Sequence, residues 1–230
     1  FYKCFWSTLS RPLTILFNSC LAGGLLCPSM RESVIIVLCK DESRRLDRNA
    51  YRPVSLLNTD YKIISNALLQ RISPVLGLVI PPWQACAVPG RSLQLHASAL
   101  RDALYWAHSR IQPAVLASFD QEKAFDRVHH GYMYQVLHAF GFPVTVIDWV
   151  RTLYAGASAT IGLNGALSDH FPIKSGVRQG CPLSPALYAM VFSPLLESLA
   201  TFLPSRMLKL PGSTALPLFA YADDLSLILR

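Results

Sequence analysis

Three aspartates stand out in this sequence because their neighbours along the chain are apolar. Asp120 directly follows the run AVLASF, and Asp223 and Asp224 lie between the runs LPLFAYA and LSLILR. A lone aspartate at a strand end or turn commonly accepts hydrogen bonds from nearby backbone N–H groups and needs no further role. Two adjacent carboxylates in an apolar hairpin repel each other, and burial adds to that cost. A divalent cation shared with a third carboxylate removes the conflict, and hard oxygen ligands favour Mg²⁺.

A strand-end aspartate together with an aspartate pair on a hairpin is the donor set that two-metal phosphoryl transfer needs. Two ions roughly 3.5–4 Å apart would activate an attacking 3′-oxygen and neutralise a leaving pyrophosphate. The formal net charge of +7 suits a polyanionic partner, although many basic proteins bind no nucleic acid. The charge therefore supports this chemistry without deciding for it.

Four segments, in chain order, resemble the sequence motifs of reverse transcriptases. They are YRPVSLLNTDYKIIS (51–65), SFDQEKAFDRV (118–128), SGVRQGCPLSP (175–185) and FAYADD (219–224). The wording is most similar to that of non-LTR (LINE-like) retrotransposons, and the resemblance covers nearly the whole chain. It implies an RNA-directed DNA polymerase, a nucleotidyltransferase that extends a DNA primer with dNTPs on an RNA template.

The resemblance implies a role for each matching position. The expected metal ligands are Asp120, Asp223, Asp224 (the weakest) and the backbone carbonyl of Gln121, holding two Mg²⁺ ions, with Mn²⁺ as an alternative. The residues expected around the incoming nucleotide are Lys40, Arg52, Lys123, Ala124, Phe125, Gln179 and Gly180. Arg91, in a Pro-Gly-Arg-Ser turn, resembles a template-contacting residue.

Alternatives stay open for several of these roles. Phe125 is either the family's steric gate, pressing on C2′ of the sugar to exclude a ribose hydroxyl, or an ordinary core residue on a helix. Arg52 offers planar donors matched to phosphate. Lys40 is either a second phosphate ligand or one charge of a solvated loop, because its K-D-E-S wording departs from the family's. Gly180 would leave room for a base where no side chain fits.

Hydrophobic spacing and turn residues predict the elements that hold these groups. Helices are expected within 1–30, over 60–76, 92–108 and 125–140, and from an N-cap at Ser184 with an apolar stripe of Leu187, Val191 and Leu195. Strands are expected over 33–39, 51–58 and 114–119, the last of them buried, with a hairpin over 216–229. The charged stretch 40–48 is expected to be an exposed loop.

The expected fold class is α+β, the right-hand polymerase fold. It would have an antiparallel palm sheet backed by helices and a mixed helix and strand fingers lobe, with the thumb missing. Within a partial reverse transcriptase domain over 1–230, residues 1–110 would be mainly fingers. Residues 111–127 and 184–230 would be palm, and 128–183 a connecting fingers/palm segment. The family's thumb follows the Y-A-D-D hairpin, so the chain is interpreted as a fragment that is inactive, or nearly so, alone.

The expected partners are an RNA template, a DNA primer, dNTP, and the thumb and other domains of a parent polyprotein. No membrane is expected, since no uninterrupted apolar run reaches the ~18 residues of a span. The six cysteines lack zinc-ligand spacing and most have apolar neighbours, which predicts buried, reduced thiols in an intracellular protein. The resemblance adds the nucleus or cytoplasm of a eukaryotic host.

Three other functions are weighed against this one. An RNA-dependent RNA polymerase would favour Gly at position 222 and a polar residue that selects ribose, so Ala222 and Phe125 argue against it. A decayed or domesticated, non-catalytic relic is disfavoured by the intact carboxylates and the intact Q-G motif. A metal-dependent nuclease leaves the segment QGCPLSP unexplained.

Overall fold

The computed structural model describes residues 1–47, 50–210 and 217–230, which form two compact units. Unit 1 contains residues 1–68 and 129–182, and unit 2 contains residues 69–128 and 183–230. The chain first passes from unit 1 to unit 2 within helix α3 (Thr59–Val79). Each unit is therefore assembled from separate stretches of sequence. Unit 2 includes residues 69–110, which the sequence assigns to the fingers, together with the residues assigned to the palm; the names fingers and palm stay predictions.

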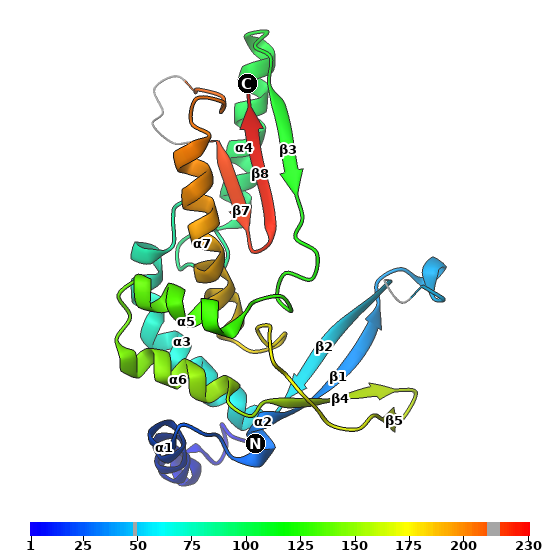
Figure 1. The fold of residues 1–230 in the computed structure, drawn as a ribbon, viewed down its shortest axis with the longest axis vertical. Coiled ribbons are helices and arrows are strands. Elements are labelled where there is room, and N and C mark those ends of the chain that lie inside the picture. The colour runs from blue at the N-terminus through cyan, green and yellow to red at the C-terminus, as the bar shows by residue number, and fades with distance from the viewer. Residues whose placement is uncertain (48–49, 211–216) are drawn as a thin grey trace. The chain divides into compact units, whose positions relative to one another are not determined.

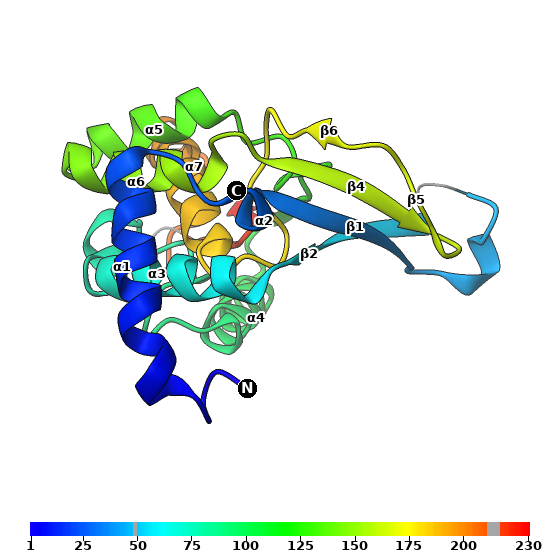
Figure 2. The same ribbon diagram turned by 90° about the horizontal axis from the view of Figure 1, so that it is seen from below.

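Unit 1 is built on a mixed sheet. Besides the first part of α3, its elements are α1 (Trp6–Gly23), α2 (Pro28–Arg31), β1 (Glu32–Cys39), η1 (Glu42–Arg44), β2 (Tyr51–Leu57), α5 (His130–Ala139), α6 (Val144–Tyr154), β4 (Ser158–Leu163), β5 (Ala166–Leu167) and β6 (Phe171–Pro172). The strand order is β2-β1-β4-β5, and β6 also pairs with β4. Figure 2 shows β1 between its antiparallel partner β2 and its parallel partner β4. The β1–β2 hairpin carries the predicted triphosphate ligands.

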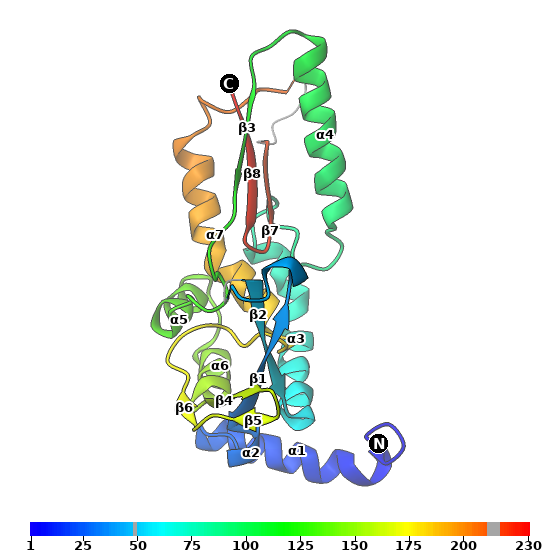
Figure 3. The ribbon, with the colours of Figure 1, turned by 90° about the vertical axis from the view of Figure 1, so that its right-hand side faces the viewer.

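Unit 2 is built on an antiparallel sheet with the strand order β3-β8-β7. Its elements are α4 (Leu93–Ser109), β3 (Val115–Phe119), α7 (Ser184–Phe202), β7 (Leu218–Tyr221) and β8 (Asp224–Leu229). Helices α4 and α7 lie on opposite sides of this sheet (Figures 1 and 3). Small residues on α4, Ala103 and Ala107, let the helix approach closely, and they pack with Leu208 and with Ile228 of β8. This core holds β8, and with it the start of that strand at Asp224.

Helix α7 is the central core helix of unit 2. Residues 186–190 are all buried, so its first half is covered on every side rather than along the predicted stripe. Leu187 is fully buried, Val191 is half-buried and Leu195 is exposed, so the stripe prediction fails in the second half. The N-cap is Leu183 rather than Ser184, and Pro185 lies in the first turn. Among the described residues, α7 is long and apolar enough to span a membrane, but buried core helices meet the same criteria of length and composition.

Two further predictions need correction. Strand β3 is exposed, including Val115, Leu116 and Phe119. It is an edge strand, and the buried residues of the sheet lie on β7 and β8 instead. The helix predicted from Phe125 begins only at His130, because residues 122–127 form turns. Four other predictions are confirmed within a few residues. The helices predicted over 60–76 and 92–108 are α3 and α4, and the strands predicted over 33–39 and 51–58 are β1 and β2.

The remaining sequence predictions divide in a similar way. The 216–229 hairpin is confirmed for its described residues as β7 and β8, while Leu216 lies outside the described residues, as does Arg48 of the charged loop. The described part of that loop is largely exposed, as expected. The six cysteines are free, but only Cys20, Cys86 and Cys181 are buried. Buried thiols are thus the state of half of them.

Candidate active site

The three aspartates singled out by the sequence lie at one end of the unit 2 sheet. The β3–β8 ladder ends at the pair Phe119 and Leu225, so the same register, continued by one residue, sets Asp120 opposite Asp224. Tyr221 pairs with Asp224 on the other side, and a two-residue loop of Ala222 and Asp223 closes the hairpin. Neighbouring strands are about 5 Å apart. Residues separated by about a hundred positions are therefore brought together by strand pairing.

The electrostatics of unit 2 agree with this placement. Partial burial, followed by the negative charges of Asp223 and Asp120, raises the pKa of the Asp224 carboxyl. Burial, followed by the charges of the same two aspartates, raises the pKa of the Tyr188 hydroxyl. Asp120 and Asp223 are thus close enough to Asp224 and Tyr188 to disfavour negative charge on those two groups.

The donor set suits a hard divalent cation, because carboxylate oxygens are the ligands that such ions prefer. Within residues 1–47, 50–210 and 217–230, no group of three or more His, Cys, Asp or Glu side chains is arranged to hold a metal ion. The three aspartates nevertheless suit a metal by their chemistry and by the strand register that sets them at one end of the sheet.

The segment after Asp120 is a turn held by α7. The Tyr188 hydroxyl donates to Oε1 of Gln121 at 2.6 Å, and the Phe125 ring stacks on the Tyr188 ring with centroids 4.8 Å apart. Lys123 is exposed and has a φ of 53°, a left-handed conformation that is uncommon for a side-chain-bearing residue. Ala124 is buried. Phe125 therefore lies in a turn, half-buried, and the premise that it lies on a helix is wrong.

Lys40 and Arg52 lie on the β1–β2 hairpin of unit 1. Arg52 pairs with Leu38, and Lys40, one residue past the end of β1, donates its N–H to the carbonyl of Ala50 at 2.7 Å. Directly opposed residues share a face, as do residues two apart, so both cations belong to one face of the hairpin. Both side chains are exposed. This is a suitable surface for a polyphosphate.

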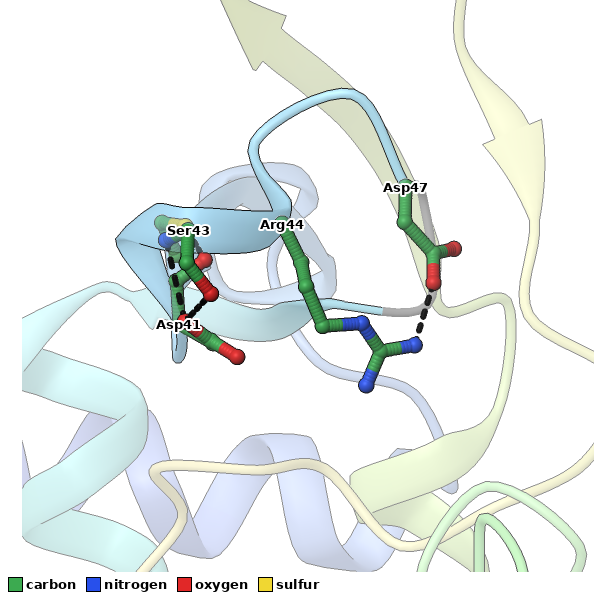
Figure 4. A network of polar contacts seen from close by, with 5 residues as sticks. Asp41, Ser43, Arg44 and Asp47 are labelled. Atoms are coloured by element: carbon green, nitrogen blue, oxygen red, sulfur yellow. Dashed lines mark hydrogen bonds and ion pairs between the residues drawn. The ribbon is translucent and has the colours of Figure 1, made fainter.

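The tip of that hairpin carries a local polar network. The Asp41 carboxylate accepts hydrogen bonds from the backbone N–H of Ser43 at 3.0 Å and from its hydroxyl at 2.6 Å, and so caps η1 (Figure 4). Arg44 pairs with Asp47 in the same view, and Arg45 pairs with Glu42. Each of these acids has a partner within the tip, and the Lys40 ammonium makes no ion pair with any residue that the structure describes.

The Q-G motif forms a turn in unit 1, in which Gln179 is half-buried. Gly180 has a φ of 96°, and a Cβ added there would lie 2.9 Å from the backbone oxygen of Ser55 on β2. The close approach of β2 and the positive φ therefore require glycine here. The predicted approach of a base to Gly180 stays a prediction beside this steric reason.

Arg178, the residue before this motif, is buried and was not singled out by the sequence. Its guanidinium donates to the carbonyl of Met30 at 3.3 Å and to that of Arg31, and lies 4.8 Å from the centre of the Tyr61 ring. These contacts fasten the Q-G turn to the start of β1.

Arg91 hydrogen-bonds to four backbone carbonyls within unit 2. Its Nη1 donates to the carbonyls of Pro81 and Gln84 at 2.6 and 2.9 Å, and its Nη2 donates to those of Gly77 and Ile80 at 3.2 and 2.9 Å. Gly77 lies in the last turn of α3 and Ile80 directly follows that helix, at an end where cationic side chains are favoured. The terminal nitrogens thus bind protein carbonyls in this structure, and the template contact of Arg91 stays a prediction.

Gln84 lies beside the hairpin turn, and the sequence did not single it out. Its side chain is fully buried and hydrogen-bonds to both the N–H and the C=O of Ala222. The only signal available in the sequence was a glutamine inside the apolar segment WQACAV, with its partner 138 residues away.

Comparison with known proteins tests the resemblance to reverse transcriptases. A family model described as "Reverse transcriptase (RNA-dependent DNA polymerase)" matches residues 40–230. The chain is 39% identical over 99% of its length to the transposon TX1 uncharacterized 149 kDa protein of Xenopus laevis and covers 17% of that protein. It is 28% identical over 92% of its length to the Pol polyprotein of the type-2 retrotransposable element R2DM of Drosophila melanogaster and covers 19% of it.

A third relative is the RNA-directed DNA polymerase from mobile element jockey of Drosophila melanogaster, which is 31% identical over 79% of the chain. The chain spans 20% of that protein, so it corresponds to about a fifth of the length of these relatives.

Among solved structures, Candida tropicalis telomerase without its C-terminal domain matches 89% of this chain with a TM-score of 0.61 at 12% identity. The match covers 45% of the telomerase chain. Candida albicans telomerase matches 87%, with a TM-score of 0.62 at 11% identity, over 38% of its chain. These structures share the fold.

Proposed function

The chain belongs to the reverse transcriptase (RNA-dependent DNA polymerase) family, and from this premise we propose that it supplies the polymerising centre of a non-LTR retrotransposon protein. The reaction is transfer of a nucleotide from dNTP to the 3′-hydroxyl of a DNA primer on an RNA template. The family as a whole uses divalent metals; for this chain we propose two Mg²⁺ ions, with Mn²⁺ as a substitute. The thumb and the other domains would come from the rest of the parent protein.

The observation that carries the proposal is the register of the unit 2 sheet. The β3–β8 register, continued by one residue, sets Asp120 opposite Asp224 at one end of an antiparallel sheet, and Asp223 directly precedes Asp224 in the hairpin turn. Divalent ions bound there would activate the primer 3′-oxygen and stabilise the leaving pyrophosphate. The carboxylates bind and orient, and no side-chain acid or base is required.

The other predicted residues are assigned roles by their surroundings. Phe125 would limit the space at C2′ of the sugar, since its ring is held by Tyr188. Arg52, with Lys40 on the same hairpin face, would bind the triphosphate, and Gln179 would contact the incoming base pair. Gly180 would serve by letting the turn approach β2.

The carboxylates provide the direct test of this function. In the full-length gene product, Asp120→Asn and Asp223→Asn are each expected to lower DNA synthesis on a primed RNA template by at least about 100-fold, because a charged metal ligand is lost. The matched control is Glu122→Gln, an exposed acid two residues from Asp120 that pairs with Arg127. This variant is expected to keep near wild-type activity.

Folding is expected to survive both aspartate substitutions, since they relieve repulsion among the carboxylates. Thermal unfolding in metal-free buffer therefore accompanies the activity assay, and a midpoint equal to or above that of wild type is expected. Near-normal synthesis by Asp223→Asn in a folded protein would remove the proposed role of the hairpin. Wild-type protein that extends no primer on RNA would overturn the proposed function itself.

A further inference from the structure

Gln84 lies next to the turn that carries two of the three aspartates. Its side chain is 0% exposed, and its Oε1 accepts hydrogen bonds from the N–H of Ala222 at 2.9 Å and from the N–H of Cys86 at 3.0 Å. Its Nε2 donates to the carbonyl of Ala222 at 3.0 Å. The reversed amide would set its NH₂ group against two N–H donors, so the network determines the orientation.

This contact completes the hydrogen bonding of an unusual turn residue. Ala222 is the first of the two hairpin-loop residues and has a φ of 53°, a left-handed conformation that is uncommon for a residue with a side chain. Neither of its backbone groups belongs to the β7–β8 ladder, which ends at Tyr221 and Asp224. The Gln84 amide binds both groups, as a neighbouring strand would.

The backbone around Gln84 is fixed independently of this side chain. The N–H of Ala85 donates to the carbonyl of Ala220 at 2.9 Å, and the N–H of Ala220 donates to the carbonyl of Trp83 at 2.7 Å. Arg91 donates to the carbonyl of Gln84 at 2.9 Å while also binding the end of α3. The amide is therefore presented to Ala222 from a rigid support within unit 2.

We propose that Gln84 is a positioning residue for the Asp223–Asp224 turn. By binding both backbone groups of Ala222, it holds the left-handed conformation that directs the two following carboxylates toward Asp120. The surroundings of Cys86 agree with this closeness: burial raises the pKa of its thiol, a hydrogen bond with the Ala222 backbone opposes that shift, and the negative charge of Asp223 adds to it. The inference rests on the proposed function for its catalytic consequence, but not for the clamp itself.

The test compares Gln84→Met with wild type in the full-length gene product. Methionine has a similar shape and no amide, so both hydrogen bonds to Ala222 are lost while the volume is largely kept. The kcat for RNA-templated synthesis is expected to fall by about 10- to 100-fold with a small change in the KM for dNTP, because a shift of about 1 Å in a reacting group can cost 100-fold. Ser193→Ala is the control: Ser193 is equally buried in unit 2, and among the described residues its hydroxyl donates only to the Ala189 carbonyl of its own helix.

A second readout does not depend on activity. In metal-free buffer, hydrogen–deuterium exchange of the peptide containing Ala222 is expected to be at least about 10-fold faster in Gln84→Met and unchanged in Ser193→Ala, because exchange follows local opening. Unchanged exchange at Ala222, or a loss of kcat that Ser193→Ala reproduces at equal stability, would overturn the proposal. If wild type makes no DNA, the proposed function fails, and the exchange result still decides whether the clamp exists.

A second variant covers the case in which methionine prevents folding. Gln84→Glu keeps the acceptor for Ala222 and Cys86 and loses only the donor to the Ala222 carbonyl. Its effects on kcat and on exchange are expected to lie between those of wild type and Gln84→Met. A folded Gln84→Glu protein with wild-type values in both measurements would equally overturn the proposal.

Discussion

The Phe125 ring lies stacked on Tyr188, with ring planes only 7° apart, and Tyr188 stacks in turn on Phe192. Phe125 is half-buried, so one part of the ring is held by α7 and the rest is accessible. A ring fixed in this way can act by steric clash, because its support resists displacement. A flexible side chain at the same position could move away from a ribose hydroxyl.

Shrinking this ring is therefore expected to relax the choice of sugar. Phe125→Val in the full-length gene product should raise the ratio of kcat/KM for ribonucleotides over deoxyribonucleotides by about 10-fold or more, a scale set by the removal of a few methylene-sized groups from a pocket. The measurement is single-nucleotide incorporation with each sugar on a primed RNA template. Tyr188→Phe is the control, since it keeps the stacked ring and loses only the hydrogen bond to Gln121.

A core role for Phe125 leads to a different outcome. Cutting a fully buried phenylalanine to alanine costs about 3–5 kcal/mol of stability and lowers every activity alike, and a half-buried ring costs less. An unchanged sugar ratio in a less stable protein would return Phe125 to the core. The choice of deoxyribonucleotide would then need another residue.

Among the elements, α4 and β7 meet at a half-buried histidine. His96 on α4 packs its ring edge-on against Phe219 of β7 with centroids 5.7 Å apart, three residues before Ala222. Burial, and to a smaller extent the positive charge of Arg91, lowers the pKa of His96, while contacts with the carbonyls of Pro82 and Ala220 oppose that shift. The neutral imidazole is therefore the form that the folded protein prefers.

This preference predicts a pH dependence of unit 2 stability. The unfolded histidine titrates near 6.5, and the folded pKa is lower, so below about pH 6.5 the unfolded state binds more protons and stability decreases as the pH falls. Chemical unfolding of wild type and His96→Gln at several pH values between 7.5 and 5 isolates the contribution of this side chain. The wild type is expected to lose more stability than the variant over that range, and parallel curves would contradict the assignment.

The sequence predicted the elements whose signals are local. The strands β1 and β2 and the Asp223–Asp224 hairpin follow from short apolar runs bounded by turns, and α4 follows from its hydrophobic spacing. The failures depend on contacts that no local pattern contains. Exposure of β3 follows from its edge position, the turn at Lys123 interrupts a helical pattern, and the Gln84 clamp joins residues 138 positions apart. For the candidate site, motif resemblance supplied the residue types, and the structure supplied the support behind them.

At the scale of the whole molecule, the predicted ligands are divided between the two units. Asp120, Asp223 and Asp224 belong to unit 2, while Arg52 and the Q-G turn belong to unit 1. We expect the basic residues behind the net charge of +7 to bind two different partners. Some would neutralise phosphates of the bound nucleic acid, and others would bind the triphosphate of the incoming nucleotide. Salt dependence separates these kinds, because each nucleic-acid phosphate that is neutralised releases counterions.

Arg52 is predicted to belong to the second kind. For single-stranded RNA the slope of log Kobs against log salt is about −0.7 per phosphate contact, so loss of one contact changes it by roughly that amount. If Arg52 binds the triphosphate, Arg52→Ala leaves the RNA affinity and its slope unchanged and raises the KM for dNTP by about 10- to 100-fold, the value of a charge-assisted hydrogen bond. RNA binding between 50 and 200 mM salt and steady-state nucleotide kinetics measure the two quantities in the same full-length protein.

Arg101→Ala is the control, because this exposed arginine on α4 pairs with Asp102 and should change neither quantity. A shallower salt slope of RNA binding, with an unchanged KM for dNTP, would place Arg52 on the nucleic-acid backbone instead. Binding of the triphosphate would then depend on Lys40 or another cation.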